Sequence, residues 1–312
     1  MTEGKINFKV ARDFGETFNI SVKFLRQNFK MYFICMLLLA GPFVLLSGIA
    51  GAYSQSVAMN KVALVRAGLL YNASPYGWEY FLSLGAQCIA LLALMCTNYS
   101  FMIVYSEKGF GNFLVTDVAK KMNEHFLKIA SGFIVFFFLI VIFIVAIVVV
   151  VGLFAQASAI LGILLVLLLF FGILLVGPNI LWQLSVSFLV ILYENDIAFM
   201  AYGRTRELMK NNYWWTWLLV VCSSIIVLML SVVFSLPSII LTLIKTYSHS
   251  TAMEETSLVL MIIYVFCAFC STMIYSALYL ISGFHFFSLL EKKDRKGLME
   301  SINDIGKPVT NS

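Results

Sequence analysis

The stretch FIVFFFLIVIFIVAIVVVVG, residues 133–152, decides the fold class because it carries no polar side chain. A helix of this length spans roughly 30 Å, which matches the hydrocarbon core of a bilayer. The run is apolar on all sides, as expected of an outer helix that faces lipid. It predicts a transmembrane helix, and five further long apolar runs extend this prediction to an all-α polytopic membrane protein.

The six predicted spans share two properties: each is long enough to cross a bilayer, and none contains Asp, Glu, Lys or Arg apart from Lys128 at the start of the third. The chain is 61% hydrophobic and 12% charged, whereas soluble domains usually carry about twice that charge. We therefore expect a single membrane domain over residues 1–312. The spans are Met31–Tyr53, Tyr80–Ser106, Leu127–Phe154, Ser158–Tyr193, Tyr213–Ile244 and Ser257–Leu290.

The basic residues are distributed asymmetrically between the connections. Of the 21 Lys and Arg residues, all but Lys61, Arg66 and Lys245 fall in segments on one side of the predicted topology. Positively charged connections stay in the cytoplasm, so both termini are predicted to be cytoplasmic in a bacterial inner membrane. The net charge of +5 then reflects orientation, and we expect no nucleic-acid partner.

A basic-polar-aromatic passage recurs before each odd-numbered span. It reads LMKNNYWWTW at 208–217, FLRQNFKMYF at 24–33 and, more loosely, KMNEHFLKIA at 121–130. We interpret this as three tandem units of interfacial helix plus two-span hairpin, at 1–106, 107–194 and 195–291, followed by a cytoplasmic tail at 292–312. The membrane interface itself favours basic and aromatic residues, which accounts for part of the pattern.

The cytoplasmic segments are predicted to contain amphipathic helices in the headgroup layer. Phe14, Phe18, Val22, Leu25 and Phe29 recur at helical spacing and form one apolar stripe. Basic and aromatic residues near the span ends are expected to anchor the chain at the interface. These anchors are Arg26, Lys30, Lys121, Lys210, Trp214 and Trp215.

The fourth span contains the main candidate site. Pro178 lacks an N–H and leaves the carbonyl of Leu174 without its helical partner, so a bend is expected there. Asn179, Trp182 and Gln183 follow it, and Asn98 is a comparable polar residue of the second span. Amides in lipid need partners, so these residues either join helices or line a cavity that binds a lipid-like molecule.

No catalytic constellation can be assembled from the sequence. The six cysteines lie within apolar runs, where they read as small buried hydrophobes, and His285 reads as an interfacial side chain. Neither a metal-binding motif nor a phosphate loop is present, so no cofactor and no metal are expected. Apart from Lys128 at a span end and His285, the spans also lack the charged and His residues that ion-coupled transporters usually keep. We therefore expect a protein that is not an enzyme.

The stretch ILYENDIAFMAYGRTRELMKNNYWWTWLL, residues 191–219, resembles a broad family of mostly uncharacterised bacterial six-helix membrane proteins. That family includes the membrane domain of some glycerophosphodiester phosphodiesterases. The resemblance implies a six-helix fold and a membrane location. It implies no hydrolase activity, because the soluble phosphodiesterase barrel has no counterpart here. The matching positions are Pro178, Glu194, Ala201, Thr205 in place of the usual Ser, Lys210, Asn212 and Trp214.

Two functional hypotheses follow. The first is a scaffold or accessory subunit of a cytoplasmic-membrane complex, with a protein partner or a second copy of the chain in the membrane. The second is a transporter or binder of lipid-like or amphiphilic small molecules, through a cavity near the bent fourth helix. Membrane lipids are expected partners under both hypotheses.

Overall fold

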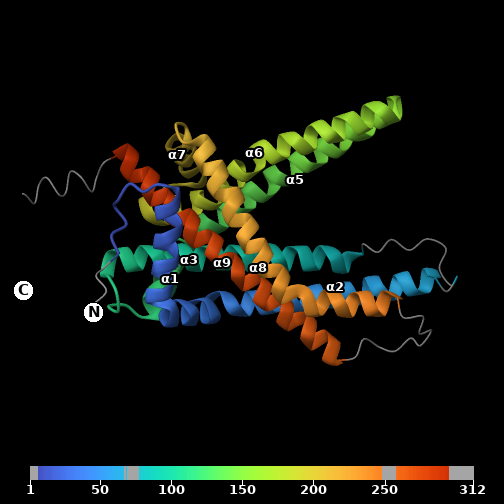
Figure 1. Ribbon diagram of the computed structural model, residues 1–312, viewed down its shortest axis with the longest axis horizontal. Helices are drawn as coiled ribbons and strands as arrows, with labels where there is room; N and C mark the ends of the chain where they lie inside the picture. The colour runs from blue at the N-terminus through green and yellow to red at the C-terminus, as the bar shows by residue number, and fades with distance from the viewer. Residues whose placement is uncertain (1–5, 67, 69–76, 248–257, 295–312) are drawn as a thin grey trace, which may run out of the picture. The chain divides into compact units, whose positions relative to one another are not determined.

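The computed structural model describes residues 6–66, 68, 77–247 and 258–294, and all regular structure in these ranges is helical (Figure 1). This confirms the predicted all-α class. The elements are α1 (Phe14–Cys35), the π-helical turn η1 (Met36–Ala40), α2 (Gly41–Arg66), α3 (Trp78–Lys108), α4 (Val115–Glu124), α5 (Phe126–Ala157), α6 (Ala159–Glu194), α7 (Ala198–Met209), α8 (Tyr213–Tyr247) and α9 (Leu258–Asp294).

Six helical stretches in the described residues are long and apolar enough to cross a membrane, as the sequence predicts. The first runs from Phe14 to Val62 without a break in helical structure. Its π-helical turn precedes Pro42, whose missing N–H disturbs the regular hydrogen-bond ladder. The N–H of Gly41 instead reaches the carbonyl of Met36. The protein is thus a multi-pass integral membrane protein.

The chain packs as two compact units. The first comprises residues 6–29, 99–223 and 279–294 among those described, and the second comprises 30–98 and 224–278, apart from the undescribed positions. The proposed three hairpin units, at 1–106, 107–194 and 195–291, concern sequence repetition and stay a prediction. Most of the predicted tail at 292–312 lies outside the described residues.

The centre of the first unit is formed by the ends of three long helices. Residues 99–105 of α3, 186–192 of α6 and 280–290 of α9 are buried without interruption. A helix that is buried on every face is surrounded by protein and not by lipid or water. These helix ends therefore form the core of a packed body. Gly283 contributes to the close packing, because a Cβ there would lie 2.5 Å from Sδ of Met102.

An aromatic cluster fills this core. Phe8, from the segment before α1, packs against Phe24 of α1 and against Phe284 and Phe287 of α9, with ring centroids 4.9–5.9 Å apart. Tyr105 of α3 contacts Phe24 at 4.9 Å. Such edge-to-face and offset pairs add specific geometry to the burial of large apolar surfaces. The cluster joins both ends of the described chain to α3.

The segment before α1 is also held by polar contacts. The backbone N–H of Arg12 donates to Oγ of Ser288, and that hydroxyl donates back to the carbonyl of Arg12. The N–H of Ile6 donates to the hydroxyl of Tyr105. These bonds satisfy backbone groups that lie outside regular structure and are buried. They position residues 6–12 against α3 and α9.

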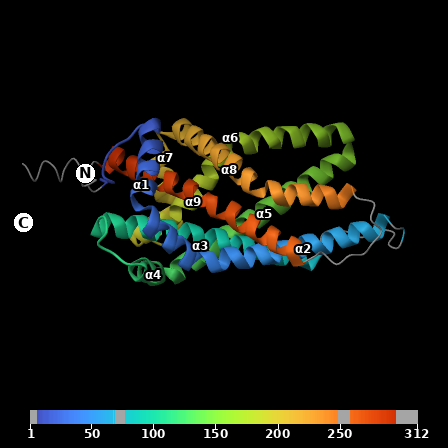
Figure 2. The ribbon, with the colours of Figure 1, turned by 60° about the horizontal axis from the view of Figure 1, so that its bottom comes forward.

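Helices α5 and α6 form a hairpin within the first unit (Figure 1), and Figure 2 shows the tight connection that joins them. Only 6% of the apolar window of α5 is buried inside the protein. Residues 137–150 are all Phe, Ile, Leu or Val except Ala146, and all are exposed except Ile147, which is half-buried. This surface is suited to hydrocarbon, in agreement with its reading as a lipid-facing helix.

The two faces of α1 differ in the exposure of their side chains. Thr17, Ser21 and Phe24 are buried, whereas Val22 and Phe29 of the predicted apolar stripe are 56% and 59% exposed. Thr17 and Ser21 satisfy their hydroxyls within the helix, on the carbonyls four residues earlier. Phe14, Phe18 and Leu25 of the stripe are half-buried. The stripe thus faces outward only in part, and the location of α1 in the headgroup layer stays a prediction.

The aromatic core should carry much of the stability of the first unit. We expect Phe284→Ala, at a fully buried ring, to lower the free energy of unfolding by about 3 kcal/mol because it removes packing and leaves a cavity. Phe138→Ala is the matched control, since Phe138 is 59% exposed on α5. Denaturation of both variants in detergent micelles measures the difference. Equal losses would contradict a packed core at Phe284.

Candidate functional site

The predicted break at Pro178 is repaired by the start of α8. The indole N–H of Trp217 donates to the carbonyl of Leu174 at 3.1 Å, and the hydroxyl of Tyr213 donates to the carbonyl of Leu175 at 3.1 Å. Proline leaves the carbonyl four residues earlier without its helical donor, and lipid offers no replacement. The aromatic residues of the 208–217 passage therefore serve α6 directly.

Asn179 and Gln183 lie on one face of α6, one helical turn apart, and point into the first unit. Asn179 is 1% exposed, and its Nδ2 donates to the carbonyl of Tyr213 at 3.4 Å. Gln183 is 6% exposed, and its Nε2 lies 3.6 Å from Sδ of Met209. A thioether is a weak acceptor. This face of α6 thus contacts the end of α7 through one weak hydrogen bond and the start of α8 through one moderate hydrogen bond.

Three buried polar atoms of this turn have no hydrogen-bond partner: Oδ1 of Asn179, Nε1 of Trp182 and Oε1 of Gln183. Trp182 is itself 2% exposed. More than nine in ten buried polar groups in proteins have a partner, so three exceptions within five residues call for an explanation. We call Asn179, Trp182 and Gln183 the α6 seam.

His285 of α9 packs against the α6 seam. The ring of Trp182 meets the ring of His285 edge-on, with centroids 5.4 Å apart. His285 is 7% exposed, and its Nε2 lies 2.9 Å from Oγ1 of Thr216 on α8. The predicted interfacial position of His285 is therefore wrong: its ring is enclosed by α6, α8 and α9, because packing of helix ends buries a residue that sequence position alone places near the surface.

Asn98 belongs to the second unit. It is fully buried, and its Oδ1 accepts a hydrogen bond from the hydroxyl of Tyr32. Its Nδ2 donates to the carbonyl of Leu94 at 2.7 Å and lies 3.5 Å from Sδ of Met36. Asn98 thus links α1, η1 and α3 with its polar atoms satisfied, which favours the helix-joining interpretation for this residue.

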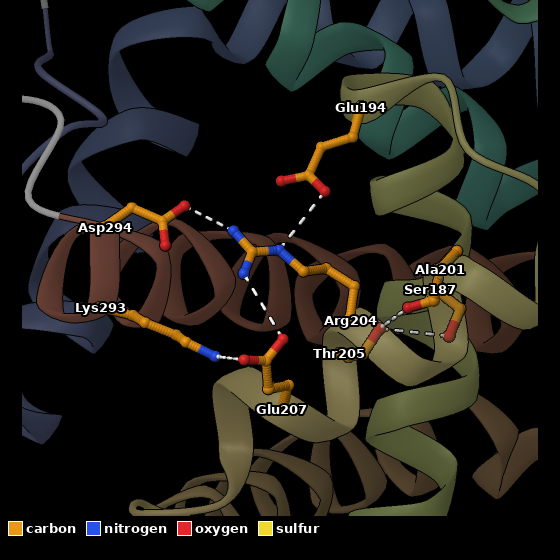
Figure 3. Close-up of polar contacts among 8 residues, drawn as sticks. All are labelled: Ser187, Glu194, Ala201, Arg204, Thr205, Glu207, Lys293 and Asp294. Carbon is orange, nitrogen blue, oxygen red and sulfur yellow. Dashed lines mark hydrogen bonds and ion pairs between the residues drawn. The ribbon is translucent and has the colours of Figure 1, made fainter.

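Ala201 and Thr205, two of the residues that carry the family resemblance, lie where α7 contacts α6 (Figure 3). Oγ1 of Thr205 donates to the carbonyl of Ala201 at 2.6 Å and lies 3.3 Å from Oγ of Ser187. All three residues are fully buried. Either hydroxyl, Ser or Thr, can make these bonds at position 205.

Next to this contact, Arg204 forms the centre of an ion network (Figure 3). Its guanidinium pairs with Asp294 at the end of α9, with Glu194 at the end of α6 at 3.5 Å, and with Glu207 on its own helix at 3.8 Å. Lys293 pairs with Glu207 as well. The network ties α7 to the ends of α6 and α9. Guanidinium suits this role because its planar fork bonds several carboxylates at once.

The predicted interfacial anchors lie at the surface to different degrees. Trp214 and Trp215 are 65% and 61% exposed, while Lys121 pairs with Glu107 at 2.8 Å. Arg26, Lys30 and Lys210 are exposed. Their anchoring role stays a prediction. The exposed rings of Trp214 and Trp215 contrast with the neighbouring Tyr213 and Trp217, whose polar atoms are bonded to α6.

A cavity of about 420 Å³ also lies in the first unit, beside the segment before α1. It is lined by Ile6, Asn7, Phe8, Lys9, Ser106, Tyr193 and Phe287, so it does not include the residues of the α6 seam. Among the described residues, no group of His, Cys, Asp and Glu is arranged to hold a metal ion.

Comparison with protein-family models, with curated proteins and with solved structures found no match for this chain. The resemblance to six-helix membrane proteins therefore stays a prediction from the residues quoted above. Sequence reasoning did identify Pro178, Asn179, Trp182 and Gln183. It missed the donors on α8, although a Tyr and a Trp at the start of the next span, on one helical face, were the available signal.

The bond between Trp217 and the Leu174 carbonyl should depend on the proline. We expect Trp217→Phe to destabilise the protein by about 1 kcal/mol, as for other hydrogen bonds between membrane helices. The same substitution should cost less in a Pro178→Ala background, because residue 178 then supplies the missing N–H. A double-mutant cycle in detergent measures this coupling. Trp215→Phe, at an exposed ring, is the control, and additive costs at 178 and 217 would refute the repair.

The ion network should respond to acid. The hydrogen bond from Lys293 and the charges of Lys293 and Arg204 lower the pKa of Glu207 below its ordinary value. A lowered folded-state pKa contributes stability that is present above the unfolded pKa and is lost as pH falls through the folded value. The difference in melting temperature between the native protein and Glu207→Gln should therefore be present at neutral pH and should shrink progressively as pH falls below about 4. A difference independent of pH would exclude this linkage.

Proposed function

We propose that this integral membrane protein is a non-enzymatic scaffold or accessory subunit of a bacterial cytoplasmic-membrane complex. One observation supports this most: the long spans end in a packed protein body. Helices α6 and α9 contain 36 and 37 residues, or roughly 54–56 Å of helix, against about 30 Å of hydrocarbon. Their ends, together with the end of α3, form the buried core described above.

The packed body has the properties expected of a docking platform. The aromatic cluster packs its interior, and a hydrogen bond joins Arg12, before α1, to Ser288 of α9. The ion pairs of Arg204 connect α7 to α6 and α9. Rigid elements present a binding surface with little loss of conformational freedom on association. The exposed Trp214 and Trp215 lie next to α7, and aromatic residues of this kind are common at protein interfaces.

The proposal predicts a stable assembly in the membrane. Extraction of the full chain from its native membrane in digitonin should yield a complex heavier than one protomer with its detergent, containing a stoichiometric partner protein or a second copy. Light scattering combined with quantitative mass spectrometry measures both mass and composition. A lone monomer in digitonin, and again in lipid nanodiscs formed directly from the membrane, would exclude the scaffold role.

A pair of variants connects the assembly to the packed body. Phe284→Leu, a conservative change in the aromatic core, should reduce the recovered complex, because it loosens the platform without unfolding the spans. Phe138→Leu on the lipid-facing side of α5 should leave the yield of complex unchanged. Equal recovery of the complex with both variants would show that assembly does not depend on the packed body.

A second candidate function is the binding of lipid-like or amphiphilic molecules at the α6 seam. The observation in its favour is the set of three unpartnered polar atoms at Asn179, Trp182 and Gln183. Buried polar groups without partners are unfavourable by about 1–3 kcal/mol each. A bound molecule that completes these hydrogen bonds would recover part of that free energy.

A further inference from the structure

The cavity of about 420 Å³ in the first unit lies where the segment before α1 meets α3, α6 and α9. We call it the N-terminal cavity. Its volume falls within the range of about 300–1,000 Å³ that is typical of small-molecule sites. On the predicted topology, the ends of these three helices lie on the cytoplasmic side. The lining residues are Ile6, Asn7, Phe8, Lys9, Ser106, Tyr193 and Phe287.

The lining combines an apolar floor with a polar rim. Ile6, Phe8 and Phe287 are at most 4% exposed, whereas Asn7 and Lys9 are exposed. Oδ1 of Asn7 accepts a hydrogen bond from the backbone N–H of Lys9 at 2.9 Å, so the donor of this amide is its Nδ2. Among the described lining residues, Lys9 alone carries a formal charge. The rim thus offers a cation and an amide donor above an apolar surface.

A second cation lies next to the rim. Arg12 is 9% exposed, and its guanidinium donates to the carbonyls of Asn7 and Val10 and lies 5.9 Å from the ring centroid of Phe284. Within the part of the chain that the structure describes, no carboxylate forms an ion pair with Arg12. Burial lowers the pKa of Arg12, while the charge of Glu16 acts in the opposite direction. This side of the cavity therefore carries positive charge that the protein neutralises only in part.

The acidic residues nearby bond to other groups. Glu107 pairs with Lys121 at 2.8 Å, and Glu194 pairs with Arg204 at 3.5 Å. The two carboxylates at the start of α1 accept hydrogen bonds from each other's backbone N–H groups. No acidic side chain among the described residues lines the cavity. Its charge therefore favours an anionic ligand.

The kind of cation favours phosphate over carboxylate. A lysine ammonium is a compact charge with three donors, and it is a common partner of phosphate oxygens. A carboxylate is bound best by the planar fork of an arginine. The guanidinium of Arg12 is already engaged by two carbonyls and an aromatic ring. Lys9 is therefore the group that meets the anion, and Arg12 adds to the positive field around it.

We propose that the N-terminal cavity binds an anionic phosphate group, with Lys9 and Asn7 as donors and the organic part of the ligand against Ile6, Phe8 and Phe287. The phosphate belongs either to the headgroup of an anionic phospholipid or to a soluble phosphate ester. Anionic lipids are concentrated in the cytoplasmic leaflet, the side on which the topology places this cavity. The site is separate from the α6 seam, and the inference is independent of both proposed functions.

The test uses the full chain in phosphatidylcholine nanodiscs that contain either phosphatidic acid or a diacylglycerol with the same acyl chains, at equal mole fraction. The phosphate charge of the host lipid is balanced by its choline. Native mass spectrometry counts the lipids that stay bound when the protein is released, and we expect phosphatidic acid to be retained in preference to the diacylglycerol.

A second arm distinguishes the two sources of phosphate. Glycerol 3-phosphate is added to the chain in a neutral detergent, and the melting temperature is measured, because a ligand of the folded state raises it. Retention of phosphatidic acid without a shift in melting temperature assigns the site to a phospholipid headgroup. A rise in melting temperature shows that a soluble ester is sufficient.

Four variants connect binding to the cavity. Lys9→Gln should lower binding about tenfold, the equivalent of one hydrogen bond to a charged group, and Lys9→Arg should keep most of it. Lys23→Gln is the matched control, because it removes the same charge from an exposed position on α1. Ser106→Phe should weaken binding by filling the cavity without a change in charge. Thermal denaturation without ligand checks that each variant is folded.

Three outcomes would overturn the inference. Equal losses in Lys9→Gln and Lys23→Gln would show that phosphate binds to basic residues in general. Unchanged binding in folded Ser106→Phe would show that the ligand does not occupy the cavity. Retention of phosphatidic acid no greater than that of the diacylglycerol, together with no shift in melting temperature, would show that the cavity binds no phosphate.

Discussion

The structure depends on one constraint: inside hydrocarbon, a polar group has no solvent to bond and must find its partner within the protein. Pro178 shows the effect of this constraint, because it has no backbone N–H and so removes one hydrogen-bond donor from α6. The partner comes from another span, through the indole of Trp217. A local defect in one helix thereby fixes how α8 begins against α6, so the proline acts as a positioning element.

The same constraint divides the polar residues of the spans into two kinds. Asn98 bonds Tyr32 and Leu94, and its polar atoms are satisfied; such residues join helices. Asn179, Trp182 and Gln183 keep buried atoms without partners. Each of these atoms lowers the stability of the fold, because a polar group loses its hydration without gaining a hydrogen bond in return.

Formal charge is handled by exclusion from the spans and concentration at helix ends. Arg204, Glu194 and Asp294 meet where α6, α7 and α9 end, and their side chains are about one-fifth exposed. Ion pairs at this depth fix geometry more than they add stability, because desolvation offsets much of the attraction. The network complements the aromatic core: the rings supply cohesion, and the ion pairs determine how α7 is oriented on the helices beneath it.

The sequence by itself determined the solvent, the class and most helix bounds; the first predicted span, Met31–Tyr53, is an exception, because the helical stretch there runs from Phe14 to Val62. Runs such as residues 133–152 admit no other reading, and the predicted spans agree with α3, α5, α6 and α8 to within a few residues. It also located Pro178 and the polar residues after it, since a missing N–H is a property of the residue type. Tertiary structure alone decided that Trp217 repairs α6, that His285 is buried and that helix ends form a packed body. These outcomes depend on which faces of distant helices meet, and lipid-exposed and protein-exposed faces of a uniformly apolar helix carry the same residues.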